Sequence, residues 1–280
     1  MGAAFRSRIK SYYDDLSKGD QRLADYLLEN SKESSRYSIQ ELAEATALST
    51  ATISRFAKKV GYQNFQELKL TLNQAGEEKN DFFLSLTAED SYLTIAEKTC
   101  QTNIHSIEAT QAMLTEKDLQ KTMAILLQST TCGFFGMGGS AVVALNAYHK
   151  FLRMPIHCFH HEDFHIQLMQ AAKMTKEDCA LVISHTGRNK DTMELMAVLK
   201  KNGVPIIGIT SYAGSPVAQA SDVALISISE ETFYRPEAIS SVVSQLSIID
   251  TLFLIYGIKM KSAAKETINE IREVIQDTRM

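Results

Sequence analysis

The stretch 38-SIQELAEATALSTATISRFAKKVG-61 decides the character of the N-terminal part of the chain. Ser38 with Glu41 fits a capping box, in which each side chain bonds a free backbone N–H at a helix start. Ser49 can cap a second helix, and Gly61 stands where a C-terminal glycine ends one. Two short helices joined by a turn of about three or four residues have the form of a helix-turn-helix.

Apolar residues in this stretch recur at helical spacing, which gives each predicted helix one buried face. The first helix presents Ile39, Leu42 and Ala43, and the pattern breaks around Thr46–Leu48. The second helix presents Ile53, Phe56, Ala57 and Val60.

The outer face of the second helix carries short hydrogen-bonding side chains and one guanidinium. In helix-turn-helix proteins the first residues of the recognition helix meet base edges, and cations a turn later can meet phosphates. The same pattern also fits an ordinary helical hairpin with a solvated polar face, and the pattern alone leaves both readings open. The candidate DNA-binding residues are Ser49, Thr50, Thr52, Ser54, Arg55, Lys58 and Lys59.

Four strings in this region resemble the N-terminal domain of RpiR-type bacterial transcription regulators. They are residues 38–43, 49–56, 61–62 and 65–69. That family usually has glycine in the turn where this chain has Ala47. If Ala47 is left-handed, alanine costs about 1–2 kcal/mol there. The resemblance implies a chain that binds a double-stranded DNA operator.

Composition favours a soluble globular protein. Apolar residues make up 45% and charged residues 22% of the 280 residues, which are ordinary values. No apolar run reaches the ~20 residues of a membrane span, since the densest, Ile248–Ile258, is short and contains Asp250. The N-terminus lacks the apolar core of a signal peptide, and the four cysteines form no Cys-x-x-Cys motif. We therefore expect a cytoplasmic protein with no membrane contact.

Charge is unevenly distributed along the chain. Residues 1–76 hold 11 Lys/Arg against 9 Asp/Glu, whereas residues 77–280 hold 18 against 24. A head so weakly basic binds DNA weakly by electrostatics alone. We therefore expect a homodimer or higher homo-oligomer that reads two half-sites.

The chain divides into three parts by its patterning. Residues 1–76 are predicted to be a helical helix-turn-helix domain, residues 77–91 a polar linker, and residues 92–280 a second domain. The second domain begins with a helical stretch, 92–128. Apolar strands then alternate with helices, which predicts an α/β fold with a doubly wound five-stranded parallel sheet of flavodoxin-like type. The expected strands are 132–138, 156–161, 179–186, 205–211 and 223–229, and long helices are expected over 236–263 and 265–277.

Two of these strand ends carry polar, glycine-containing loops that enter helices. The first spans residues 136–140 and the second residues 184–192. Hydroxyls and free N–H groups at a helix start suit an oxyanion, although Ser and Thr there can also merely cap the helix. The first loop is neither a P-loop nor a full Gly-x-Gly-x-x-Gly motif. Two such loops after different strands of one sheet favour an anionic ligand.

The two loops resemble those of the SIS (sugar isomerase) domain, which hold a sugar phosphate. Asn189 stands where a threonine is usual, and a segment near the C-terminus with Ser241, Gln245 and Asp250 also resembles RpiR regulators, with Val242 replacing a common arginine. The resemblance implies a phosphosugar effector and no cofactor. The candidate ligand-binding residues in the loops are Gly136, Gly138, Gly139, Ser140, Ser184, His185, Thr186, Gly187, Asn189 and Thr192.

Histidines crowd into residues 157–165. His161 and His165 are four apart, a spacing that can place two imidazoles on a metal, but Glu162 and Asp163 more simply cap a helix. The string 163–167 resembles the RpiR sensor domain, where it borders the ligand pocket. We therefore expect no metal and assign His161 and His165 to the neighbourhood of a sugar hydroxyl.

Two functions remain at this stage. The first is a transcriptional regulator of carbohydrate metabolism genes, not an enzyme, in which helices within 92–128 and 236–263 build a dimer and the ligand shifts the spacing of the DNA-binding heads. The alternative is a sugar-phosphate isomerase or lyase with acid/base residues drawn from Glu162, Glu231, Glu237 and His161. No pair of these has a spacing that marks it as catalytic, and a helix-turn-helix would be idle in an isomerase.

Overall fold

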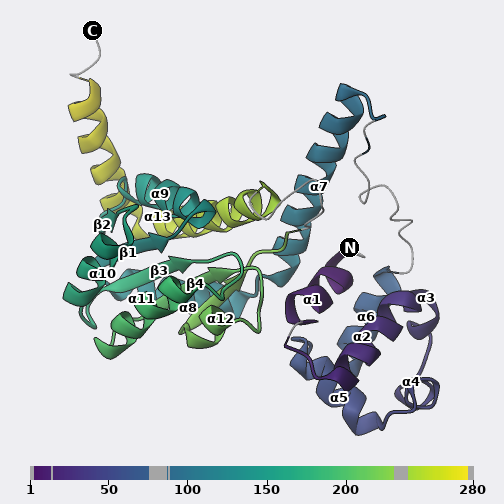
Figure 1. The fold of residues 1–280 in the computed structure, drawn as a ribbon. Helices are drawn as coiled ribbons and strands as arrows, with labels where there is room; N and C mark the ends of the chain where they lie inside the picture. Colours follow the sequence, from purple (N-terminus) through teal and green to yellow (C-terminus); the bar gives the residue numbers. More distant parts are fainter. Residues whose placement is uncertain (1–2, 14, 76–86, 88, 230–238, 277–280) are drawn as a thin grey trace. The chain divides into compact units, whose positions relative to one another are not determined.

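A computed structural model describes residues 3–13, 15–75, 87, 89–229 and 239–276 (Figure 1). These residues form two compact units. The first contains the described residues up to Met113 together with Ile228 and Ser229, and the second contains Leu114–Ser227 and the described residues from Ile239 on. Most of the predicted linker, and the candidate acids Glu231 and Glu237, lie outside the described residues.

The first unit is helical, as predicted for its N-terminal part. Its core is built from large apolar side chains that are at most 1% exposed, among them Phe5, Leu27, Ile53 and Phe56. Each such burial stabilises the fold by about 1.5–3 kcal/mol. The helices are α1 (Ala3–Tyr13), α2 (Lys18–Glu29), α3 (Ser31–Ser34), α4 (Ile39–Thr46), α5 (Thr50–Lys59), α6 (Phe65–Ala75) and α7 (Tyr92–Met113).

Helices α4 and α5 form the predicted pair of short helices. The capping box is confirmed: Ser38 N–H donates to Glu41 Oε2 at 2.6 Å, and Glu41 N–H donates to Ser38 Oγ at 3.2 Å. Ser49 caps α5 by accepting from Thr52 N–H at 3.1 Å. Ala47 between the helices is left-handed, with φ 52° and ψ 35°. The cost of about 1–2 kcal/mol expected for a left-handed alanine therefore applies to this turn.

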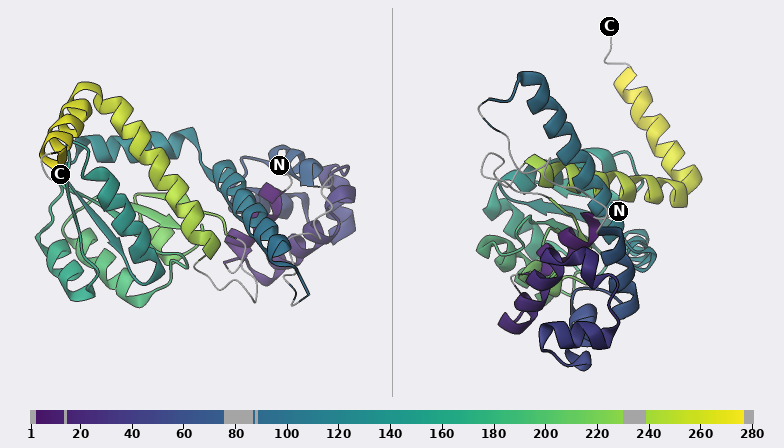
Figure 2. Two further views of the ribbon diagram at one scale, coloured as in Figure 1. Left: turned by 90° about the horizontal axis from the view of Figure 1, so that it is seen from above. Right: turned by 90° about the vertical axis from the view of Figure 1, so that its right-hand side faces the viewer.

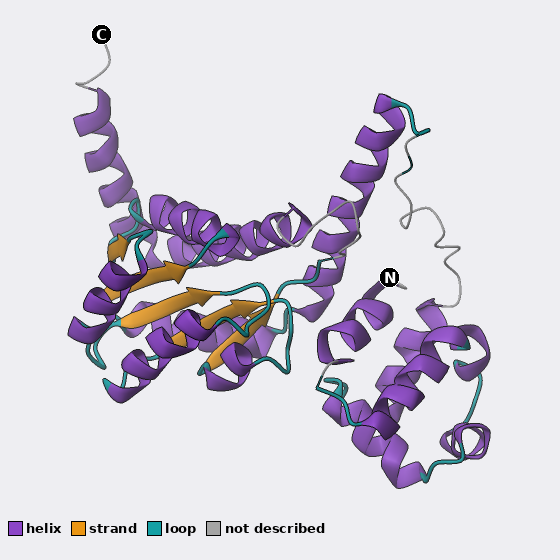
Figure 3. Cartoon of the chain, viewed as in Figure 1, coloured by secondary structure: helices purple, strands orange, loops and turns teal. Residues whose placement is uncertain are grey.

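The second unit contains the predicted five-stranded parallel sheet, with strand order β2-β1-β3-β4-β5 (Figure 3). Each strand lies inside, or within one residue of, its predicted range. The strands are β1 (Thr131–Gly136), β2 (His157–His160), β3 (Cys179–Ile183), β4 (Ile206–Thr210) and β5 (Val223–Ile226). The helices are α8 (Glu116–Gln128), α9 (Gly139–Phe151), α10 (Phe164–Lys173), α11 (Lys190–Lys201), α12 (Pro216–Ala220) and α13 (Ile239–Gln276).

Helices cover both faces of this sheet (Figure 2). Successive residues of a strand point to opposite faces, so Phe134 packs with α8, α9 and α13 while Phe135 packs with α10, α11 and α12. The strands are therefore apolar throughout, which explains why they were recognisable as continuous apolar runs.

Two helical stretches differ in detail from the prediction. The stretch 92–128 is interrupted, because Thr115 accepts a hydrogen bond from Asp118 N–H at 3.1 Å and starts a new helix there. The helical dihedrals of α13 break at Lys261, with φ 40° and ψ −103°, which agrees with a boundary between the two predicted C-terminal helices.

Among the described residues one helix, Ser241–Gln276, has the length and the mean hydropathy, 1.6, of a membrane span. Three of its large side chains, Ile248, Ile249 and Leu252, are fully buried against the sheet. The apolar character of α13 therefore has a structural cause in the core of the second unit.

Candidate functional site

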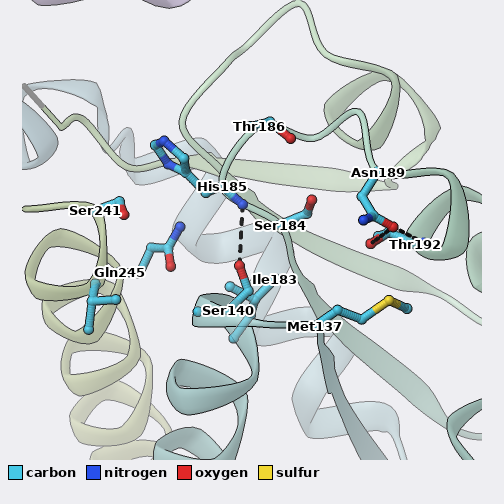
Figure 4. A pocket seen from close by; sticks show the side chains of 12 residues that line it. Met137, Ser140, Ile183, Ser184, His185, Thr186, Asn189, Thr192, Ser241 and Gln245 are labelled. Atoms are coloured by element: carbon cyan, nitrogen blue, oxygen red, sulfur yellow. Dashed lines mark hydrogen bonds between the residues drawn. The ribbon is translucent and has the colours of Figure 1, made fainter. Parts of the chain in front are cut away.

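The sheet places a cavity where its winding reverses. From neighbouring strands β1 and β3 the chain turns into helices on opposite faces, α9 and α11, and ligands bind at such crevices beyond the carboxyl ends of parallel strands. The cavity holds about 210 Å³ (Figure 4). It is lined by Met137, Gly139, Ser140, Ile183, Ser184, His185, Thr186, Asn189, Thr192, Ser241, Val242 and Gln245.

The first loop folds tightly around Gly136. A Cβ atom on Gly136 would lie 2.6 Å from the carbonyl oxygen of Ser140, so only glycine allows this close approach. Ser140 N–H donates to Met137 O at 3.1 Å, and the Ser140 hydroxyl accepts from His185 N–H at 3.4 Å. The loop thus brings the start of α9 to the cavity wall, where the positive end of the helix dipole favours an anion.

The second loop depends on Gly187 and Asn189. Gly187 has φ +63°, and a Cβ there would lie 2.2 Å from Ser215 Oγ. Asn189, which replaces the usual threonine, caps α11 with its side-chain oxygen, which accepts from Thr192 N–H at 3.0 Å. The start of a second helix therefore also reaches the cavity.

His185 is tied to the neighbouring strand β4. Its Nδ1 shares a hydrogen bond of 2.8 Å with Ser211 Oγ. Its carbonyl oxygen accepts from Ser211 N–H at 2.9 Å and from Thr210 Oγ1 at 3.1 Å. The ring of His185 is thereby fixed at the edge of the cavity.

The third wall comes from the start of α13, whose residues were not predicted as ligand contacts. Gln245 is 1% exposed, and among the described residues its Nε2 has no hydrogen-bond partner. Leaving a buried donor unpaired costs about 1–3 kcal/mol. An oxygen atom of a ligand would remove that cost.

The predicted ligand residues fall into three groups. Those that line the cavity are Gly139, Ser140, Ser184, His185, Thr186, Asn189 and Thr192. Gly136, Gly138 and Gly187 belong to the same loops but are not among the lining residues. His161 and His165 are exposed and do not line it, and His161 Nδ1 accepts from Asp163 N–H at 3.0 Å.

The described walls of the cavity lack acidic and strongly basic side chains. No lining residue is a carboxylate, a lysine or an arginine, so an anion would be held by neutral donors and helix starts. Among the described residues no cluster of three His, Cys, Asp or Glu side chains has the arrangement of a metal site.

The predicted DNA-binding residues lie on α5 and its cap. Ser49, Thr50 and Arg55 are exposed, Thr52 and Ser54 are partly exposed, and Lys58 is exposed. Arg55 Nη2 donates to Thr52 Oγ1 at 3.5 Å. The structure thus places the side chains of this group at the surface of one helix.

Lys59 differs from Lys58 because it forms an ion pair inside the unit. Its Nζ lies 2.8 Å from Asp20 Oδ2, and the Asp20 side chain is only 17% exposed. Partial burial raises the pKa of Asp20, but the hydrogen bonds from Lys59 and Ser17 outweigh it, so the pKa is lowered overall. Lys59 is therefore engaged before any DNA arrives.

Each of the two parts of the chain matches a known domain family. Residues 4–79 match the helix-turn-helix domain of the rpiR family, and residues 125–255 match the SIS domain. The chain is 34% identical over 248 residues to the HTH-type transcriptional regulator HexR of Pseudomonas aeruginosa, covering 88% of this chain and 86% of HexR. It is 32% identical over 268 residues, 95% of each chain, to an uncharacterized HTH-type transcriptional regulator of Caldanaerobacter subterraneus.

Solved structures share the fold. The Vibrio vulnificus NanR protein complexed with ManNAc-6P matches with a TM-score of 0.62 at 22% identity, over 98% of this chain and 99% of NanR. The sugar isomerase domain of an RpiR transcription factor from Sphaerobacter thermophilus matches with a TM-score of 0.59 at 17% identity, over 64% of this chain and 98% of that domain.

The relatives decide between the two functions that the sequence left open. Those at 32% and 34% identity are named transcriptional regulators, and they align with nearly the whole chain, DNA-binding part included. The isomerase or lyase alternative therefore does not stand. The chain belongs to the rpiR family of helix-turn-helix transcriptional regulators, with a SIS domain following the DNA-binding domain.

Proposed function

We propose that this regulator controls genes of carbohydrate metabolism, and that a phosphorylated sugar bound in the cavity sets its affinity for operator DNA. One observation carries the proposal. Two strand-to-helix loops rich in hydroxyls converge on a single cavity whose described walls contain no carboxylate. Such a site suits a phosphate dianion, which hydroxyls and helix starts can bind without repulsion from a carboxylate.

The phosphate is assigned to the side of the cavity between the two helix starts. Ser184 is 5% exposed, and its backbone N–H donates to Ile209 O at 3.0 Å. This hydrogen bond fixes the position of the residue. Figure 4 shows the Ser184 and Thr186 hydroxyls at the loop that enters α11. Hydroxyl and backbone donors of this kind form short, strong bonds to phosphate oxygens.

The sugar hydroxyls are assigned to the opposite wall, formed by α13. Gln245 offers its buried amide donor, and Ser241, 2% exposed, lies one turn before it. A neutral amide reads a hydroxyl without competing for the phosphate. NanR, which shares the fold, is described in complex with ManNAc-6P, and this supports a sugar 6-phosphate as the class of effector.

A homodimer completes the proposal, because two recognition helices are needed to read two half-sites. Both helical stretches expected to build it carry exposed apolar side chains: Leu93 of α7 is 69% exposed, and Leu254 and Ile258 of α13 are 59% and 69% exposed. The adjacent helix α9 adds Val142 and Leu145, which are 59% and 43% exposed. The regulator acts in the cytoplasm, where operator DNA is found.

The cavity is tested by ligand binding to the full-length protein. A thermal-shift screen uses glucose 6-phosphate, glucosamine 6-phosphate, N-acetylmannosamine 6-phosphate and arabinose 5-phosphate, each beside its unphosphorylated sugar. We expect at least one phosphorylated member to raise the melting temperature and its unphosphorylated partner not to do so. Calorimetry on Ser184→Ala then gives affinity at least tenfold weaker, about 1.4 kcal/mol, whereas the exposed control Ser262→Ala binds as wild type. Equal affinity of Ser184→Ala and wild type would place the phosphate elsewhere.

A further inference from the structure

A series of buried hydroxyls leads from the ligand cavity to the end of the sheet. His185 Nδ1 bonds Ser211 Oγ at 2.8 Å, and Ser211 Oγ shares a second hydrogen bond of 3.0 Å with Ser227 Oγ. Ser211 is 6% exposed and Ser227 is fully buried. Because both hydroxyls are buried and bonded in series, a change at the His185 ring can reach both serines.

The residue after Ser227 is held by a different part of the fold. Ile228 belongs with the first unit, and its backbone N–H donates to Thr110 Oγ1 of α7 at 2.8 Å. Thr110 is 2% exposed, and its hydroxyl also donates to Ser106 O at 2.7 Å. One peptide bond, Ser227–Ile228, thus joins the hydroxyl series of the cavity to the buried side of α7.

The same end of α7, in its last turn, is bound to the end of the helix-turn-helix. Arg8 Nη2 donates to Ala112 O in the last turn of α7 at 3.3 Å, and Arg8 Nη1 donates to Gly61 O, just after α5, at 2.9 Å. The guanidinium also lies 4.6 Å from the centre of the Tyr62 ring. A planar guanidinium can hold two helix ends in one fixed geometry, which a lysine cannot.

We propose that Ser211, Ser227, Thr110 and Arg8 are positioning residues that transmit the state of the ligand cavity to the recognition helix α5. A ligand that contacts His185 changes the Ser211–Ser227 bond, and this changes how the chain at Ile228 holds Thr110. Helix α7 carries the change over two residues to Ala112, and Arg8 passes it to Gly61. The inference rests on the proposed function, since it names the route by which the sugar phosphate acts on DNA.

This route makes a distinction that binding measurements can detect. In the described part of the chain, the side chains of Thr110 and Arg8 form their hydrogen bonds with Ser106, Ile228, Ala112 and Gly61, so changing them should leave each binding event nearly intact. What they change is the coupling, the ratio of operator affinities with and without ligand. Couplings of this kind typically amount to about 5–150-fold.

The test compares Thr110→Val with Thr99→Val in the full-length protein. Valine keeps the shape of threonine and removes its hydroxyl. Thr99 lies on the same helix and is partly exposed, and its hydroxyl donates to Ile95 O of its own helix at 2.7 Å. The operator is a fragment that wild type selects from a random DNA pool. The ligand is the panel sugar phosphate with the largest thermal shift.

In Thr110→Val we expect the ligand-dependent change in operator Kd to fall at least fivefold, while the sugar-phosphate Kd stays within about threefold. Thr99→Val keeps the full change. An undiminished change in Thr110→Val would overturn the route and leave the proposed function intact. A wild-type chain whose operator affinity responds to no phosphorylated sugar would instead overturn the proposed function itself.

A second pair of variants keeps the test decisive if Thr110→Val folds poorly. Arg8→Lys retains the charge but loses the planar fork, and the exposed Arg6 on the same helix gives the matched control Arg6→Lys. We expect Arg8→Lys to bind both the sugar phosphate and the operator and to lose at least threefold of the coupling. Full coupling in Arg8→Lys would contradict the proposed role of its two carbonyl contacts.

Discussion

Ala47 lies in the turn of the helix-turn-helix, in a backbone conformation that is unfavourable for alanine. It joins α4 to α5 in the left-handed conformation, with φ 52°, which costs a non-glycine residue about 1–2 kcal/mol. Its N–H still bonds carbonyls of α4, and Leu48 N–H donates to Ala43 O at 3.0 Å. The turn therefore forms, and it keeps strain that a single substitution can relieve.

Replacing Ala47 by glycine should stabilise the helix-turn-helix. Part of the relieved strain is offset by the greater freedom of glycine in the unfolded chain, so we expect a gain of about 0.5–1 kcal/mol. Native-state hydrogen exchange of the α4 and α5 amides measures it. Ala51→Gly, inside α5 and exposed, is the control and should lower protection by a similar amount. A loss of protection in Ala47→Gly would show that the turn is not strained.

Several side chains of the site could be foreseen and others could not. Ser140, Ser184 and Thr186 follow strands whose apolar runs fix where the loops begin, so local sequence was enough. Gln245 comes from a helix more than 50 residues farther along the chain, and its orphaned amide is visible only in the folded structure. Local periodicity carries no information about that long-range contact.

At the scale of elements, strand order explains why His161 and His165 do not line the cavity. Strand β2 pairs with β1 on the side away from β3, while the cavity lies between β1 and β3. The residues that follow β2, including His161 and His165, therefore emerge at a different part of the sheet. Strand order cannot be deduced from the spacing of histidines, whereas the five strands themselves could be predicted from their apolar runs.

The recognition helix α5 gives a prediction about base contact. Arg55 is exposed one turn into the helix, close to Thr52, where side chains of such helices meet base edges. Arg55→Ala should weaken binding to the selected operator by about 1–3 kcal/mol and leave binding to unrelated DNA nearly unchanged. Fluorescence anisotropy with both DNAs measures this. An equal loss on the two DNAs would mean that Arg55 contacts phosphate only.

Helix α4 gives a prediction about pH. Hydrogen bonds from the Ser38 backbone and side chain lower the pKa of Glu41 below its ordinary value of 4.5. A carboxylate with a lowered folded-state pKa stabilises the fold above its unfolded pKa and loses that effect as the pH falls through the folded value. Wild type should therefore melt higher than Glu41→Gln at pH 6, and the gap should close toward pH 3. Glu44→Gln, in the same helix, serves as control. A gap that is constant with pH would remove the charge from the explanation.

At the scale of the whole molecule, the outer surface of α9 and α13 remains to be explained. These helices pack side by side over one face of the sheet (Figure 1), and Lys150 of α9 pairs with Asp250 of α13. Their outward apolar side chains recur along both helices, which suits a self-complementary interface between two copies. A contiguous group of exposed apolar residues usually marks a surface that binds a partner.

Charged substitutions on this surface test the proposed homodimer. Leu254→Asp with Ile258→Asp would bury two carboxylates in each half of the interface, at a cost that a standard interface of about 800 Å² per partner cannot absorb. Light scattering should then give the mass of one chain, 31.2 kDa, in place of twice that value. Operator affinity should fall with it, because a single weakly basic head binds DNA weakly. Val274→Asp, 70% exposed near the end of α13, is the matched control and should stay dimeric. If the double variant still has twice the chain mass and binds operator as wild type, the dimer is built on another surface.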